Sequence, residues 1–301
     1  MHDAILLKNI HKTFGATKAV TDLDLAIPRG ALYGFIGPNG AGKTTTIRMI
    51  MAILFPDSGE LSILGHRSAL EAKRRIGYLP EERGVYRKMR VGPFLTFMAR
   101  LKGVPEADIA GRIKRGLARV GLADAERKRC EELSKGTQQK IQFIAAIIHQ
   151  PDLLILDEPF SGLDPVSSRS LRDLVLEEHA RGATILFSTH VMPHAEELCD
   201  HVVMIHKGQK VLDDPVDAIR RRYDPRVIEF DPLDPHADLS PLSAIPEVED
   251  VIRTDHGCKV VLRPGASAPS VMPRLAIAVP PARIEIARPT LEEVFVKLVG
   301  A

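Results

Sequence analysis

The sequence predicts an α/β fold built on a mostly parallel sheet, followed by a smaller α+β domain. Leu153-Leu154-Ile155-Leu156 is an uninterrupted apolar run, as expected for a central strand covered on both faces. Strand patterns at Thr184–Ser188 and Val202–Ile205 leave room for helices at Ser167–His179 and Pro193–Leu198, and this alternation indicates parallel strands. A glycine-rich loop between a short buried strand and a helix is the third feature that predicts this class.

The composition is ordinary for a globular chain of one or two domains. Of the 301 residues, 45% are hydrophobic and 27% are charged, and the formal net charge of +2 predicts no strong attraction to nucleic acid. Cys130, Cys199 and Cys258 form no close pair, which favours a reducing cytosol over a disulfide framework or a zinc site. No segment approaches the roughly 18 apolar residues of a transmembrane helix, so work at a membrane would require another chain to span it.

The N-terminal part is predicted to be rich in strands. Residues 22–27 alternate polar and apolar, the period of a half-buried strand. Turn signals at 28–30 and 57–59 separate the strands. The predicted strands are Ile5–Lys12, Lys18–Ile27, Leu32–Ile36, Glu60–Leu64 and Ile76–Leu79.

Between the strand Leu32–Ile36 and a helix at Thr45–Leu54, the chain matches the phosphate-binding pattern G-x-x-x-x-G-K-[ST]. The glycines let consecutive N–H groups point into one concavity, Lys43 supplies positive charge for the β- and γ-phosphates, and the Thr44 hydroxyl is placed to ligate Mg²⁺. Because both flanks fit, a glycine-rich turn with a chance lysine is the weaker interpretation, and we predict nucleoside triphosphate binding. The predicted loop is Gly37, Pro38, Asn39, Gly40, Ala41, Gly42, Lys43, Thr44 and Thr45.

From residue 91 to about residue 150 the apolar spacing becomes helical, which predicts a helical subdomain. Basic clusters at 112–115 and 127–129 allow a polyanion-binding patch, but the acidic residues among them favour a solvated helix face. The first predicted apolar face, at i, i+3, i+4 and i+7, comprises Phe94, Phe97, Met98 and Leu101. The second comprises Ile109, Ile113, Gly116, Leu117 and Val120.

Two acidic residues end the apolar run at 153–156. We predict that Asp157 holds Mg²⁺ and that Glu158 accepts a proton from an attacking water. The interval from Lys43 to Asp157 is longer than a compact GTPase needs, and no N-K-x-D segment for reading guanine is found. A kinase or GTPase is therefore a weaker alternative than an ATPase with a helical insertion.

Within that insertion, Leu133-Ser134-Lys135-Gly136-Thr137 precedes an apolar helix. Ser134 is predicted to cap the helix and Gly136 to permit close backbone approach, which makes a second anion-binding helix terminus. The stretch resembles the L-S-G-G-Q signature loop of the ATP-binding-cassette (ABC) ATPases, with Lys135 replacing a glycine and Thr137 the glutamine. The resemblance implies that Ser134, Lys135, Gly136 and Thr137 face the ATP of a second subunit in a head-to-tail dimer.

Other segments resemble the family in the expected order. His190, in Ser188-Thr189-His190, resembles the switch histidine, which implies that its imidazole contacts the γ-phosphate and holds the attacking water. Together with Lys43 and Glu158 it makes up the predicted catalytic set. Phe14 matches the aromatic position that stacks on adenine, although a single phenylalanine also fits a core. The loop that contacts the opposite subunit in the family is matched by Ser161, Gly162, Leu163 and Asp164.

One position departs from the family pattern. Glu81, in Pro80-Glu81-Glu82, stands where the family normally carries a glutamine that touches Mg²⁺ and the attacking water. A carboxylate binds Mg²⁺ at least as readily, but it adds repulsion against the γ-phosphate. We expect Thr44, Glu81 and Asp157 to form the metal side of the site, with a tighter Mg²⁺ requirement.

The composition changes near Pro225. Eleven of the 22 prolines lie in residues 224–301, which predicts short helices and short strands there. We expect an ATPase domain at 1–222 and an accessory α+β domain at 223–301. The predicted elements of the accessory domain are strands Val227–Phe230, Val248–Arg253, Lys259–Leu262 and Arg283–Ile286 and a closing helix Leu291–Leu298.

The resemblance covers about residues 4–220 and, more loosely, 221–301. Pro-Glu-Glu-Arg-Gly, Leu-Ser-Lys-Gly and the accessory domain resemble the subgroup that serves sodium- and drug-export transporters. This implies an ATP- and Mg²⁺-dependent P-loop ATPase, a homodimer by default, on the cytoplasmic face of the membrane through a separate permease subunit. The alternatives are a cassette ATPase that acts on ribosomes or nucleic acid, and a module that binds ATP without hydrolysing it. The absence of a second cassette disfavours the first, and the intact catalytic residues disfavour the second.

Overall fold

A computed structural model describes residues 3–82, 84–223, 226–255 and 257–300. The chain divides into two compact units, Met1–Val216 and Asp217–Ala301. This division lies at the start of helix α8 (Val216–Arg222), ahead of the predicted boundary at residue 222. Among the described residues, none of the helices combines the length and the apolar character needed to cross a lipid bilayer.

The first unit contains a three-stranded antiparallel sheet with the order β2-β1-β4. The alternation predicted at residues 22–27 is present, because Leu23, Leu25 and Ile27 are buried while Asp24 is exposed. The apolar faces of these strands form one core with residues of the central sheet. The strands are β1 (Asp3–Phe14), β2 (Thr17–Pro28) and β4 (Ser58–Ile63).

The central sheet has six strands in the order β5-β6-β7-β3-β8-β9. The first five are parallel, which confirms the predicted fold class, and β9 adds an antiparallel edge that the sequence did not predict. Strands β3 and β6 are buried throughout. The strands are β5 (Ile76–Leu79), β6 (Leu153–Asp157), β7 (Thr184–Thr189), β3 (Leu32–Ile36), β8 (His201–His206) and β9 (Gln209–Pro215).

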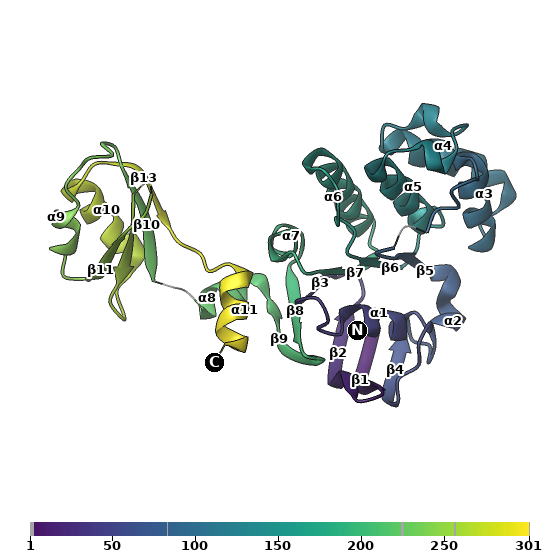
Figure 1. The fold of residues 1–301 in the computed structure, drawn as a ribbon, viewed down its shortest axis with the longest axis horizontal. Coiled ribbons are helices and arrows are strands. Elements are labelled where there is room, and N and C mark those ends of the chain that lie inside the picture. Colours follow the sequence, from purple (N-terminus) through teal and green to yellow (C-terminus); the bar gives the residue numbers. More distant parts are fainter. Residues whose placement is uncertain (1–2, 83, 224–225, 256, 301) are drawn as a thin grey trace. The chain divides into compact units, whose positions relative to one another are not determined.

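Helices cover both faces of this sheet. Helix α1 (Lys43–Ile50) lies between the central sheet and the antiparallel sheet, whereas α6 (Pro165–Ala180) and α7 (Met192–Leu198) lie on the opposite side of the central sheet (Figure 1). The prediction that α1 continues to Leu54 is wrong. Met51 is its C-cap, and Ala52 has a left-handed backbone, φ 55°, which ends the helix.

Three longer helices form the predicted helical subdomain: α3 (Val91–Leu101), α4 (Glu106–Arg119) and α5 (Lys135–Ile147) (Figure 1). The predicted face of α4 is buried, but that of α3 is only partly so. Phe94 is buried, whereas Phe97 and Leu101 are exposed, because α3 turns Val91, Leu95 and Ala99 inward instead.

The second unit has its own four-stranded antiparallel sheet, in the order β11-β12-β10-β13, and its own apolar core. The expectation of short helices there is wrong for α10 (Ala268–Ala278), which contains Pro273. Pro269 lies in the first turn, where a missing N–H costs nothing, and Val271 and Leu275 are buried. The other elements are β10 (Val227–Pro232), α9 (Ser240–Ser243), β11 (Val248–Arg253), β12 (Cys258–Leu262), β13 (Pro281–Ile286) and α11 (Leu291–Val299).

Candidate nucleotide-binding site

The glycine-rich loop connects β3 to α1 and packs tightly against neighbouring backbone. A Cβ added to Gly37, φ 157°, would lie 2.2 Å from the carbonyl oxygen of Ile205, and one added to Gly42, φ 109°, would lie 2.6 Å from that of Ala19. Only glycine fits these two positions. Gly42 is also the N-cap of α1, so the positive end of the helix dipole faces the loop.

Lys43 is the first residue of α1 and is held inside the loop. Its Nζ donates hydrogen bonds to the carbonyl oxygens of Gly37 at 2.7 Å and Pro38 at 3.2 Å. The side chain is only 6% exposed. A buried ammonium group in this concavity attracts anions, as phosphate binding requires.

Glu158 brings together the three residues predicted to be catalytic. It directly follows β6, and its Oε1 lies 3.6 Å from Lys43 Nζ and 2.9 Å from His190 Nδ1. The backbone N–H of Glu158 donates to the carbonyl oxygen of Ser188 at 3.1 Å, which ties this turn to the end of β7. Glu158 is buried, whereas His190 is partly open to solvent.

Asp157 is the last residue of β6 and is almost completely buried. Its Oδ1 accepts a hydrogen bond from Ser188 Oγ at 2.5 Å. Burial raises the pKa of Asp157, and the negative charges of Glu81 and Glu158 raise it further. Ionised acids crowded in this way are stabilised by a hard cation with oxygen ligands, so the donor set fits Mg²⁺.

The described residues hold no group of three or more His, Cys, Asp and Glu arranged for a metal ion. A Mg²⁺ ion here would therefore take part of its ligands from elsewhere. Mg²⁺ is usually held by one or two carboxylates together with phosphate oxygens and waters. The candidate Mg²⁺ ligands that the chain itself supplies are Asp157, the Thr44 hydroxyl and Glu81.

Lys43, Thr44, Glu81 and Glu158 border one cavity of about 560 Å³, whereas Asp157 and His190 are not among the residues that line it. It is lined by residues 39–45 of the loop together with Glu81 and Glu158. Four further lining residues were not predicted from the sequence; they come from the β1–β2 hairpin and the β8–β9 turn and are Thr17, Lys18, Ala19 and Lys207. No local pattern marks them, because tertiary packing alone brings these turns to the loop.

Phe14 lies at the end of β1, in the same hairpin, but it is not among the residues that line the cavity. Its ring is half exposed, and Lys12 Nζ lies 5.5 Å from the ring centroid. A surface ring with a nearby cation is available for stacking. Its contact with adenine stays a prediction.

The signature segment starts α5 as predicted. Ser134 is the N-cap, and its Oγ accepts the backbone N–H of Thr137 at 3.3 Å. A Cβ on Gly136 would lie 2.7 Å from Ser167 Oγ, and this hydroxyl donates to Asp164, the N-cap of α6. The Ser134–Thr137 and Ser161–Asp164 segments are therefore neighbours.

Neither of these two segments lines the cavity of its own chain. Ser134, Lys135, Ser161 and Gly162 are not buried, and Gly162 has the left-handed backbone, φ 67°, of a turn. Their predicted action on the nucleotide of a partner subunit stays a prediction.

Comparison with known proteins supports the same reading of both units. Residues 20–161 match the family model "ABC transporter", and residues 215–299 match "ATP-binding protein DrrA1-3-like, C-terminal domain". The uncharacterized ABC transporter ATP-binding protein YhaQ of Bacillus subtilis is 39% identical over 297 residues, 99% of each chain. The bacitracin transport ATP-binding protein BcrA of Bacillus licheniformis is 31% identical over 305 residues, which cover 100% of this chain and 98% of BcrA.

Among solved structures, one described as the ATP binding subunit of an ABC transporter aligns with a TM-score of 0.68 and 32% identity. The alignment covers 73% of this chain and 93% of that one. The relatives match in sequence over the full length, and the solved subunit matches in fold. The glycine-rich loop, the acids Asp157 and Glu158 at the end of β6 and the capped signature helix are all present. The chain therefore belongs to the ATP-binding subunits of ABC transporters.

Proposed function

We propose that this protein hydrolyses ATP in the cavity beside α1 and thereby drives export through a separate membrane-spanning subunit. The observation that carries the proposal is the position of the buried Glu158 carboxylate, 3.6 Å from Lys43 Nζ and 2.9 Å from His190 Nδ1. A carboxylate between a phosphate-binding lysine and an imidazole is placed to act on a water beside the terminal phosphate.

Each residue then has one task. The loop N–H groups and Lys43 bind the phosphates and neutralise their charge. Glu158 accepts the proton of the attacking water, and His190 orients that water and the γ-phosphate. Mg²⁺, held by Thr44 and Asp157 with Glu81 nearby, would neutralise charge on the β- and γ-phosphate oxygens.

The proposed working unit is a homodimer. The chain carries one phosphate loop and one signature segment, and Ser134 does not border the cavity of its own chain. A second copy arranged head to tail would bring its Ser134–Thr137 helix terminus to that cavity. A helix N-terminus is a favourable place for the γ-phosphate.

The permease partner is proposed to dock on the helical subdomain, which holds the subunit at the cytoplasmic face of the membrane. Phe97 and Leu101 on α3 and Tyr86, in the segment just before α3, are exposed, and the centroids of the Tyr86 and Phe97 rings lie 5.8 Å apart. Large apolar side chains gathered on a surface mark interaction sites. The DrrA-like second unit and the similarity to BcrA favour a drug-like cargo.

The test is a pull-down with Glu158→Gln in the presence of ATP and Mg²⁺, from solubilised membranes of the organism that encodes the chain. The substitution keeps the size of the side chain and removes the proton acceptor, so bound ATP is not consumed and the closed dimer accumulates. We expect a polytopic membrane protein to be recovered with ATP and not with ADP. Wild-type protein under the same conditions is the control.

Recovery of ribosomes or nucleic acid in place of a membrane protein would contradict the transporter proposal and leave only the ATPase. A Glu158→Gln protein that hydrolyses ATP at the wild-type rate would contradict the assignment of Glu158.

A further inference from the structure

Helix α5 carries two glutamines whose side chains bond the backbone beside the two acidic segments of the site. Gln139 Nε2 donates to the carbonyl oxygen of Pro159 at 3.1 Å, and Pro159 follows Glu158. Gln142 Nε2 donates to the carbonyl oxygen of Glu82 at 3.3 Å, and Glu82 follows Glu81. The two glutamines are three residues apart, on one face of the helix.

Both side chains are buried, with 4% of Gln139 and 6% of Gln142 exposed. The Oε1 atom of Gln142 is buried without a hydrogen-bond partner in the described part of the chain. An amide oxygen buried in this way costs free energy, so an apolar side chain of the same size would serve packing better. What the Gln142 amide provides in return is the hydrogen bond from its Nε2 to the Glu82 carbonyl oxygen.

The N-terminal end of α5 is the signature segment. Ser134 caps the helix, and about 12 Å of continuous helix separates it from Gln142. A helix of this length moves as a rigid body, so a displacement of its N-terminal end reaches both glutamines.

We propose that Gln139 and Gln142 are positioning residues that couple the N-terminus of α5 to Glu158 and Glu81 in the same chain. Through the Pro159 and Glu82 carbonyls, they hold the two acidic segments in a fixed relation to the helix. Engagement of the α5 terminus by a partner's nucleotide then sets the position of the chain's own metal and proton-accepting carboxylates. This inference rests on the proposed ATPase function.

The test uses the full-length chain with Gln139→Leu and Gln142→Leu. Loss of one hydrogen bond of ordinary strength corresponds to about a fivefold effect. We expect Gln142→Leu to raise the Mg²⁺ concentration for half-maximal ATPase activity by about that factor, because Glu81 is released. We expect Gln139→Leu to lower kcat by about the same factor with little change in KM for ATP, because Glu158 is released.

Gln138 provides the matched control on the same helix. Its Nε2 donates to the carbonyl oxygens of Cys130 and Leu133 at 3.0 Å each and bonds neither acidic segment. Gln138→Leu is expected to lower the melting temperature while the Mg²⁺ dependence stays as in the wild type. If Gln142→Leu does not fold, Gln142→Glu keeps the length of the side chain and still removes the donor.

Two results would overturn the coupling. One is wild-type kcat and Mg²⁺ dependence in both leucine variants, and the other is an equal change of Mg²⁺ dependence in Gln138→Leu. Failure of the ATPase function itself is recognised separately, by wild-type protein without Mg²⁺-dependent hydrolysis or by a fully active Glu158→Gln.

Discussion

At the scale of single residues, Glu158 owes its position to an unfavourable backbone conformation. Its φ of 49° lies in the left-handed region, which costs a residue with a Cβ about 1 kcal/mol. Hydrogen bonds to the turn offset this cost, because Ser161 N–H donates to the Glu158 carbonyl and Glu158 N–H to that of Ser188. Because of this turn, the Glu158 carboxylate lies beside Lys43 and His190. If β6 continued in an extended conformation, the carboxylate would lie farther along the strand direction, away from both.

Glu81→Gln tests the effect of the extra carboxylate on the metal requirement. Glu81 lines the cavity and raises the pKa of Asp157 through its charge. Its removal weakens repulsion against the γ-phosphate, so ATP binding without Mg²⁺ is expected to strengthen about fivefold, the factor that ~1 kcal/mol represents. Titration with ATP in the presence of EDTA measures this directly.

Glu82→Gln is the matched control, because Glu82 is also exposed and acidic but does not line the cavity. Unchanged ATP affinity and unchanged Mg²⁺ dependence in Glu81→Gln would show that Glu81 has no part in the metal side of the site.

His149 makes the fold sensitive to acid. Burial, followed by the charge of Lys102, lowers the pKa of His149 from 6.5 to about 4. Between these values the unfolded chain binds a proton that the folded chain does not, so stability falls as the pH falls through this window. His149→Gln removes the titration while keeping a side chain that can donate to the Ile76 carbonyl, 3.1 Å from His149 Nε2.

We expect acidification from pH 7 to pH 5 to destabilise the wild type by about 2 kcal/mol more than His149→Gln. Urea unfolding at the two pH values measures the difference. An equal pH response of His149→Gln and wild type would contradict the assignment.

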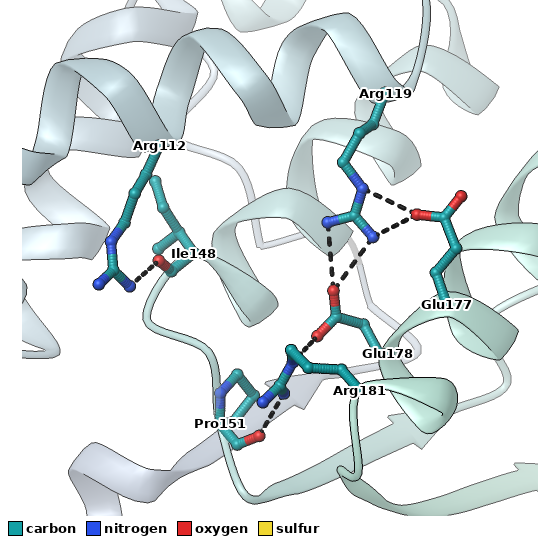
Figure 2. Close-up of polar contacts among 7 residues, drawn as sticks. All are labelled: Arg112, Arg119, Ile148, Pro151, Glu177, Glu178 and Arg181. Atoms are coloured by element: carbon teal, nitrogen blue, oxygen red, sulfur yellow. Dashed lines mark hydrogen bonds and ion pairs between the residues drawn. The ribbon is translucent and has the colours of Figure 1, made fainter.

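At the scale of elements, a buried carboxylate joins the helical subdomain to the core of the first unit. Glu178 on α6 accepts hydrogen bonds from Arg119 on α4, at 3.1 Å, and from Arg181, at 2.8 Å (Figure 2). Arg181 Nη2 also donates to the carbonyl oxygen of Pro151, in the connection between α5 and β6. Glu177, beside it, pairs with Arg119 from a solvent-exposed position.

Glu178→Ala is therefore expected to lower the free energy of unfolding by about 3 kcal/mol, because two arginines lose a buried partner. Glu177→Ala, which breaks an exposed pair with the same Arg119, should cost no more than about 1 kcal/mol. Chemical denaturation of the two variants side by side gives the comparison. Equal losses of unfolding free energy in the two variants would mean that the burial of Glu178 does not strengthen its ion pairs with the arginines.

Elements whose structure is determined by their own residues were predicted accurately, whereas elements that depend on distant parts of the chain were not. The bounds of β3 and β5 were predicted correctly, because fully apolar strands next to a loop or turn are marked by their own residues. Strand β9 was missed because it is a half-exposed edge that ends in Asp213-Asp214-Pro215 and is held by pairing with β8. The exposure of Phe97 was missed because periodicity shows that a face is apolar, not which partner covers it.

The site divides in the same way. The loop at 37–45 and the acids Asp157 and Glu158 were identified from local patterns, and in the structure residues 39–45 and Glu158 line one cavity. Lys18 and Lys207 reach that cavity from distant turns, and their sequence neighbours give no sign of it. The bonds from Gln139 and Gln142 depend on how α5 packs and are equally hidden in the sequence.

At the scale of the whole molecule, each unit has a core of its own. The core of the second unit joins its sheet to α10, through residues such as Phe230, Val260 and Leu275, all fully buried. A closed sheet-and-helix core of this kind provides the apolar burial that independent folding requires. The DrrA-like family model matches this part of the chain as a domain, residues 215–299.

We therefore expect the fragment Asp217–Ala301 to fold without the first unit. Its thermal unfolding, followed by circular dichroism, should be a single cooperative transition. Phe230→Ala, which removes a fully buried ring from β10, should lower the free energy of unfolding of the fragment by about 3–5 kcal/mol. The cooperative transition should then disappear or move to a much lower temperature. Ile277→Ala on the exposed side of α10 is the control and should leave it nearly unchanged. A fragment that unfolds without cooperativity while the full-length chain unfolds cooperatively would mean that the second unit depends on the first for its stability.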